Sequence, residues 1–182
     1  EILRAEMLAS GKPVPEKAAV YLPSNRYHIP AVLSSLQMKP SEIRWMEDLP
    51  ETPKKTEIVL FLGCFAHTGP DKIFTAIDIF SKLNRDFIAL GGGVSACCGA
   101  AYALVGDVEA ADKAARKLLA DIAAFQPQHA VFWCPSCLSR LLTIYASDFS
   151  RSIKYQHLSS FLAENMNQLN FIHKINKVVT VH

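Results

Sequence analysis

The chain has 182 residues, of which half are hydrophobic and a fifth are charged; this composition is typical of a folded domain and excludes a disordered one. The net charge is only +2 and no dense patch of Lys and Arg occurs, so nothing indicates a nucleic-acid partner. Because no run of about 18 apolar residues is present, we expect no membrane span in this chain.

Residues 1–55 are predicted to form a lead-in segment, a helix followed by an irregular region. The spacing of apolar residues predicts a helix over residues 1–9, a short strand over 18–22 and a short helix over 30–38. Three prolines, at positions 40, 50 and 53, favour irregular structure in the remainder. Trp45 and Met46 are expected to anchor this region on the main core.

From residue 56 to 182 the pattern becomes regular, and strands alternate with helices. Short apolar runs predict strands over 58–62, 86–90, 129–133 and 178–181. Helical periodicity predicts helices over 70–83, from Asp107 as the cap to about 125, over 138–145, and from residue 158 or 159 onward. This alternation predicts an α/β domain with a layered, mainly parallel sheet.

All five cysteines lie between residues 64 and 137, in three places. Cys64 follows the first predicted strand, Cys97 and Cys98 follow the second, and Cys134 and Cys137 follow the third as Cys-Pro-Ser-Cys. Ligands of open parallel sheets gather at the carboxyl ends of the strands. We therefore expect the three groups of cysteines to meet at one edge of the sheet.

An odd number of cysteines argues against a disulfide framework. A bond between Cys97 and Cys98 would also be strained, because adjacent Cα atoms lie about 3.8 Å apart, below the roughly 4.4 Å at which ordinary disulfides begin. Thiolates favour zinc, copper(I) and iron–sulfur clusters. A single zinc ion takes four ligands, whereas a cluster with several irons can use five.

The spacing of the cysteines resembles that of a known family. Cys64 is separated by 32 residues from Cys97-Cys-Gly, and 34 further residues lead to Cys134-x-x-Cys. Four further segments add to the resemblance: Phe61-Leu-Gly-Cys-Phe, Phe87-Ile-Ala-Leu-Gly-Gly-Gly, Gly106-Asp, and Tyr155-Gln-His-Leu-Ser-Ser-Phe-Leu. Over roughly residues 57–182 the chain resembles the CCG-domain family of cysteine-rich iron–sulfur proteins, which includes heterodisulfide reductase subunits B and D.

The resemblance implies a cofactor and a function. The five cysteines of one such motif bind a noncubane [4Fe–4S] cluster, and that role would fall on Cys64, Cys97, Cys98, Cys134 and Cys137. The chain would then be the iron–sulfur subunit of a heterodisulfide-reductase-like oxidoreductase of anaerobic metabolism, transferring electrons and reducing a disulfide. Its partners would be other subunits of an electron-transfer complex, including a ferredoxin-like cluster domain, in the cytoplasm or at the inner face of the membrane.

The ends of the sequence suggest a piece of a longer polypeptide. The chain starts at Glu1 within a predicted helix and ends at His182 within a predicted strand. A second Cys-Cys-Gly motif or a ferredoxin motif outside these residues would fit the resemblance.

Several alternatives remain open at this stage. The centre could be a pure electron relay to a membrane quinone or haem partner, or a zinc-stapled structural module. A thioredoxin-like Cys-Pro-Ser-Cys leaves the other three cysteines without a role. His67 could hydrogen-bond a cluster sulfur or cap the next helix, while His129, His157 and His173 are expected to be structural or solvent-facing. No side chain is assignable as a catalytic acid or base.

Overall fold

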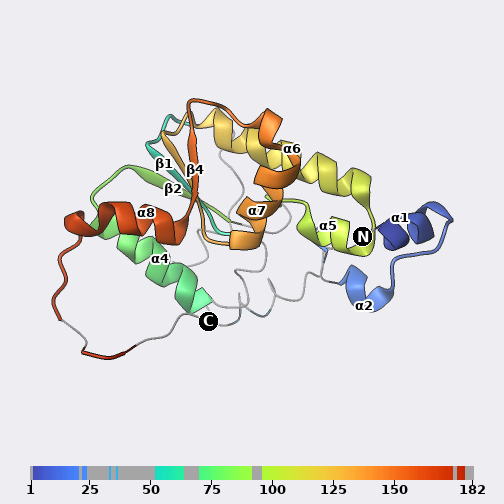
Figure 1. Cartoon of the computed structure of the whole chain (residues 1–182), viewed down its shortest axis with the longest axis horizontal. Helices are drawn as coiled ribbons and strands as arrows, with labels where there is room; N and C mark the ends of the chain where they lie inside the picture. Colours follow the sequence, from blue (N-terminus) through green and yellow to red (C-terminus); the bar gives the residue numbers. More distant parts are fainter. Residues whose placement is uncertain are drawn as a thin grey trace.

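The computed structural model describes residues 2–20, 22–23, 33, 36, 52–63, 70–91, 96–173 and 176–178. The described part contains a sheet of four strands, in the order β2-β1-β3-β4, in which every pairing is parallel. The strands are β1 (Ile58–Phe61), β2 (Phe87–Leu90), β3 (His129–Phe132) and β4 (Lys154–His157). The predicted α/β class with a parallel sheet is confirmed (Figure 1).

The sheet is covered on both faces, which explains why β1 is an uninterrupted apolar run. Successive side chains of a strand point to opposite faces. Val59 and Phe61 accordingly pack in one core with α6 and α7, while Ile58 and Leu60 pack in a second core with α4 and α8. Buried on both sides, β1 has no position that favours a polar residue.

Four predicted helices are present, each after one strand of the sheet. They are α4 (Pro70–Lys82), α6 (Val108–Ala124), α7 (Pro135–Ile144) and α8 (Leu158–Asn165). Asp107 caps α6, because its carboxylate accepts a hydrogen bond of 2.9 Å from the amide of Ala110. The predicted apolar face of α6 is buried, namely Ala111, Ala115, Leu118, Leu119 and Ile122.

The helix α7 begins earlier than predicted. It starts at Pro135 instead of residue 138, so that Cys134 is its N-cap and Cys137 lies in its first turn. Proline is well tolerated at the first position of a helix, since its missing N–H would have no intrahelical partner there. The short helix α5 (Ala100–Val105) was not predicted at all.

In the lead-in, the predicted first helix is confirmed as α1 (Ile2–Ala9). The strand predicted over residues 18–22 is wrong, because α2 (Glu16–Ala19) occupies its first half and a turn follows. A run of a few apolar residues carries no periodicity that separates a strand from a short helix. The helix predicted over 30–38 lies outside the described residues apart from positions 33 and 36, as do Trp45 and Met46.

The last strand of the sheet was missed. β4 has the polar sequence Lys-Tyr-Gln-His, and among the described strands it pairs only with β3, at the edge of the sheet. The strand predicted over 178–181 lies outside the described residues apart from Val178, which is not in a strand. Two short 3₁₀ helices, Ala146–Asp148 and Met166–Gln168, complete the described elements.

Candidate metal centre

The order of the strands creates a crevice between β1 and β3. The chain moves from β1 to β2 on one side, and then returns past β1 to place β3 and β4 on the other side. At such a reversal the connections leave in opposite directions, and the space beyond the carboxyl ends of the two central strands is the usual ligand site of an open α/β sheet. The residues that follow β1 and β3 therefore border this position.

Gly63 and the Cys-Pro-Ser-Cys segment meet at this position. A Cβ atom on Gly63 would lie 3.2 Å from Cβ of Cys134 and 3.5 Å from Sγ of Cys137. The φ angle of Gly63 is +79°, a left-handed conformation that a glycine adopts without strain. The residue that precedes Cys64 in the sequence thus lies against the third cysteine group, Cys134 and Cys137.

The start of α7 holds the sulfur of Cys134. As N-cap, this residue is extended, with φ −93° and ψ 115°, and the nearby backbone amides of Cys137 and Ser136 help to lower the pKa of its thiol. These amides are among the donors that have no intrahelical acceptor at a helix N-terminus. The sulfur of Cys134 therefore lies where an ordinary N-cap side chain places its oxygen, although it makes no capping hydrogen bond.

The vicinal pair is set in a tight turn before α5. The amide of Gly99 donates a hydrogen bond of 3.3 Å to Sγ of Cys97. Both cysteine side chains are buried, with 6% of Cys97 and 1% of Cys98 exposed. Because Gly99 has a φ of +82° and is the N-cap of α5, the turn directs two neighbouring side chains into one region, which an extended strand would not do.

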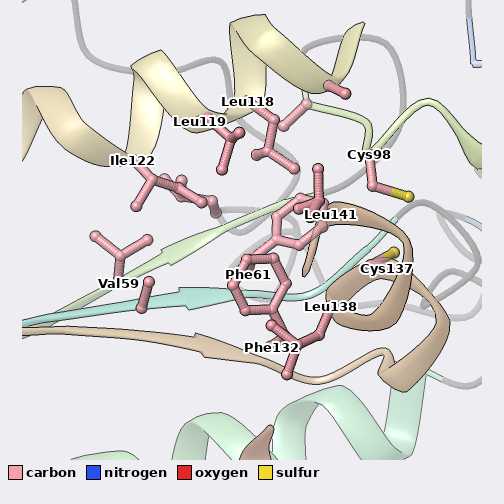
Figure 2. Close-up of a cluster of buried hydrophobic side chains, with 14 of the residues drawn as sticks. Val59, Phe61, Cys98, Leu118, Leu119, Ile122, Phe132, Cys137, Leu138 and Leu141 are labelled. Atoms are coloured by element: carbon pink, nitrogen blue, oxygen red, sulfur yellow. The ribbon is translucent and has the colours of Figure 1, made fainter. Parts of the chain in front are cut away.

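The two cysteine groups are in contact through their sulfur atoms. The thiol of Cys98 interacts with those of Cys97 and Cys137, and the thiol of Cys137 also interacts with that of Cys134. Figure 2 shows the sulfurs of Cys98 and Cys137 on the same side of the core, beyond the strand ends and next to the first turn of α7. Residues almost forty positions apart in the sequence are therefore brought together.

These contacts give the three thiols different pKa values. Hydrogen bonds from Cys137 and Cys97, the amide of Ala100 and the charge of Arg140 lower the pKa of Cys98 well below that of an ordinary thiol. The hydrogen bond from Cys137, together with the backbone amides, lowers the pKa of Cys134 to about 6. The pKa of Cys137 is raised, because its proton is held between these two sulfurs.

The predicted ligand set is described only in part. Cys64 and His67 lie outside the described residues, so the fifth position of the predicted array is not placed. Within the part of the chain that the structure describes, no group of three or more His, Cys, Asp or Glu side chains is arranged to hold a metal ion. The described sulfurs contact one another in a row, Cys97 with Cys98, Cys98 with Cys137 and Cys137 with Cys134.

The chemistry of the donors nevertheless fits a soft metal or an iron–sulfur centre. Four sulfurs lie on two neighbouring turns, and the described contacts favour the thiolate form of Cys98 and Cys134. The thiolate is the form that binds metal, and zinc, copper(I) and iron–sulfur clusters are its usual partners.

The sequence analysis missed Arg140. This residue follows Cys137 by three positions in α7, and side chains three apart on a helix are neighbours. The spacing alone could have found it. His157, expected to be structural, caps α8 by accepting from the amide of Ser159.

A separate apolar groove of about 840 Å³ lies between α1, α2 and α5. Its described lining contains no cysteine and includes Leu3, Met7, Leu8, Ala101, Leu104 and Val105. Arg4 joins α1 to α5 beside it, by a hydrogen bond of 2.7 Å from Nη1 to the carbonyl of Leu104.

No described helix is both long and apolar enough to cross a bilayer. A comparison with protein-family models finds no match, and comparisons with curated proteins and with solved structures find no significant match.

Proposed function

We propose that this chain is the iron–sulfur subunit of a heterodisulfide-reductase-like oxidoreductase, with its centre bound by Cys64, Cys97, Cys98, Cys134 and Cys137. The observation that carries the proposal is the contact between the sulfurs of Cys98 and Cys137, which brings the vicinal pair to the Cys-Pro-Ser-Cys turn. The contact of Gly63 with Cys134 and Cys137 supports a contribution from the next residue in the sequence, Cys64.

A noncubane [4Fe–4S] cluster would supply one-electron transfer and an iron that accepts a sulfur ligand from substrate. The chain's own residues would favour the thiolate form of these ligands, through the amide of Gly99 at Cys97 and the amides of Ser136 and Cys137 near Cys134, and the burial of Cys97, Cys98 and Cys137 would shield them from water. Reduction of a disulfide consumes two electrons and two protons and yields two thiols. The electrons would come from a ferredoxin-like partner, and the reverse flow uses the same groups.

A structural zinc site is the second candidate, and one observation favours it. The sulfurs of Cys97, Cys98, Cys137 and Cys134 form a continuous row of contacts, and a tetrahedral Cys₄ zinc site takes four thiolates. Such a site would use Cys97, Cys98, Cys134 and Cys137, and would leave Cys64 without a role.

Metal analysis of the anaerobically purified protein tests both candidates. We expect about four iron and four acid-labile sulfide per chain, as a [4Fe–4S] centre requires, and little zinc. One zinc per chain without sulfide would refute the cluster.

The variant Cys64→Ser makes the test sharper. It should lose most of the iron if the cluster uses five cysteines, whereas a Cys₄ zinc site would keep its full metal content. Ser136→Ala, a change within the same metal-binding turn that removes no sulfur, is the matched control and should retain the iron of the unchanged protein.

A measurement during turnover distinguishes a catalytic centre from one that only relays electrons. A disulfide substrate added to the complete complex should change the electron paramagnetic resonance signal of the centre if substrate sulfur meets an iron. An unchanged signal during electron transfer would favour the relay to a quinone or haem partner.

A further inference from the structure

The side chain of Arg140 carries a buried donor with no use in the described fold. Its Nε atom is shielded from solvent and has no hydrogen-bond partner. Buried polar groups in folded proteins are nearly always paired, so each exception calls for an explanation. Among the described residues Arg140 also forms none of the ion pairs that tie other arginines to carboxylates.

The position of Arg140 directs it to the cysteine region. It lies one turn after Cys137 on α7, on the same side of the helix. Its positive charge acts on the sulfur of Cys98. The guanidinium therefore lies within electrostatic range of Cys98, in the turn before α5, and extends from the side of α7 that carries Cys137.

A buried phenol holds the other side of this guanidinium. The hydroxyl of Tyr145, a residue with 3% of its surface exposed, interacts with both Arg140 and Asp112. Asp112 is in turn bound by Nε of Arg116 at 2.9 Å. The chain of contacts from α6 through Tyr145 restricts the guanidinium while leaving Nε unpaired.

We propose that Arg140 is a positioning cation of the cysteine centre, whose guanidinium donates a hydrogen bond to a sulfur of that centre. This inference rests on the proposed function. A fixed positive charge and an N–H···S hydrogen bond both favour the more negative, reduced state of an iron–sulfur centre, and hydrogen bonds to sulfur are among the known determinants of reduction potential. Arg140 thereby raises the potential at which the centre accepts an electron.

The test is a redox titration of the iron-loaded protein, followed by electron paramagnetic resonance. Arg140→Gln should shift the one-electron equilibrium about tenfold towards the oxidised form, which lowers the midpoint potential by about 59 mV. Arg140→Met, which keeps the apolar stem and removes the charge, is made in parallel in case the Gln variant does not fold. Arg151→Gln, a change at an exposed arginine in the turn before β4, is the control and should leave the potential unchanged.

Arg140→Lys separates the charge from the packing of the side chain. It should recover at least half of the shift, and no recovery would overturn the assignment of a charge effect. Iron and sulfide are measured for every variant. If Arg140→Gln and Arg140→Met contain a full complement of iron and sulfide but keep the midpoint potential of the wild-type protein, this inference alone is overturned. If the wild-type protein itself contains no iron, both the proposed function and this role of Arg140 are overturned.

Discussion

Gly99 packs directly against the carbonyl group of Ala111, so that a Cβ atom on Gly99 would lie 2.2 Å from that oxygen. The contact joins the turn of the vicinal cysteines to the first turns of α6. Because Gly99 also has a φ of +82°, two independent constraints exclude any other residue there. This is the physical reason for glycine in the Cys-Cys-Gly sequence.

Gly99→Ala should therefore lower the free energy of unfolding by more than a left-handed residue alone would cost. Backbone strain at such a position is on the order of 1 kcal/mol, and the displacement of α6 adds to it, for an expected total above about 2 kcal/mol. Denaturant unfolding measures the loss.

Gly11→Ala is the matched control for this prediction. Gly11 has the same φ of +82°, but a Cβ atom there would have no neighbour within 4 Å. It should show only the strain of the backbone. Equal losses for the two variants would contradict the role of the Ala111 contact.

Cys98→Ser tests whether the buried member of the vicinal pair is a ligand. Cys98 contacts sulfurs on both sides, from Cys97 and Cys137, and a hydroxyl is a poor ligand for soft metals. We expect the variant to retain less than half of the iron and sulfide of the unchanged protein after anaerobic purification. Full retention of both would refute the five-ligand assignment.

His157 ties the end of β4 to the segment that carries Cys134. Its Nδ1 accepts from the amide of Ser159, so Nε2 carries the proton and donates to the carbonyl of Trp133 at 3.2 Å. His157→Ala removes the cap and leaves this carbonyl without its donor, and should reduce the free energy of unfolding by about 1–2 kcal/mol.

His157→Asn should recover the capping part of that loss, because asparagine is a favoured N-cap residue. It should not restore the bond to Trp133, since its side chain is shorter. His173→Ala, at an exposed position, should change the stability by less than about 0.5 kcal/mol. Calorimetric or denaturant unfolding distinguishes these outcomes, and a neutral His157→Ala would contradict the link.

The sequence predicted an element best where its local signals and its tertiary packing favour the same structure. α6 could be bounded to within a residue because Asp107 is a strong cap and the apolar stripe from Ala111 to Ile122 faces one core. β4 could not be found, since an edge strand with one buried side chain, that of Gln156, shows no apolar run. The position of β4 is determined by its pairing with β3 and by the helix that follows it. Neither interaction produces a recognisable pattern in the sequence of β4.

The proximity of the segments that follow β1 and β3 was predictable, and the local structure of the cysteine turns was not. The order of strands and helices implies that residues after β1 and β3 are neighbours, and Gly63 does contact Cys134. The start of α7 at Pro135 was missed because the helix was predicted to begin only after the last cysteine, at residue 138. The role of Gly99 depends on α6, which is close only in the folded chain.

His129 gives the fold a dependence on pH that is separate from the cysteines. Its Nδ1 is buried without a partner, and burial, followed by the charges of Arg85 and Lys154, lowers its pKa below the usual 6.5. In the unfolded chain the imidazole takes up a proton near pH 6.5, whereas in the folded chain it remains neutral to lower pH. Between these two values the unfolded state binds more protons, so the stability falls as the pH falls.

His129→Leu should remove this component. The difference in unfolding free energy between the unchanged protein and His129→Leu should be constant above about pH 7.5, and should decrease below pH 6.5 by at most about 1.4 kcal/mol per pH unit. His173→Leu, at an exposed histidine, should give a difference that does not vary over the same range. Denaturant unfolding at closely spaced pH values measures both differences. If the difference between the wild-type protein and His129→Leu does not vary with pH, the imidazole titrates alike in the folded and unfolded chains.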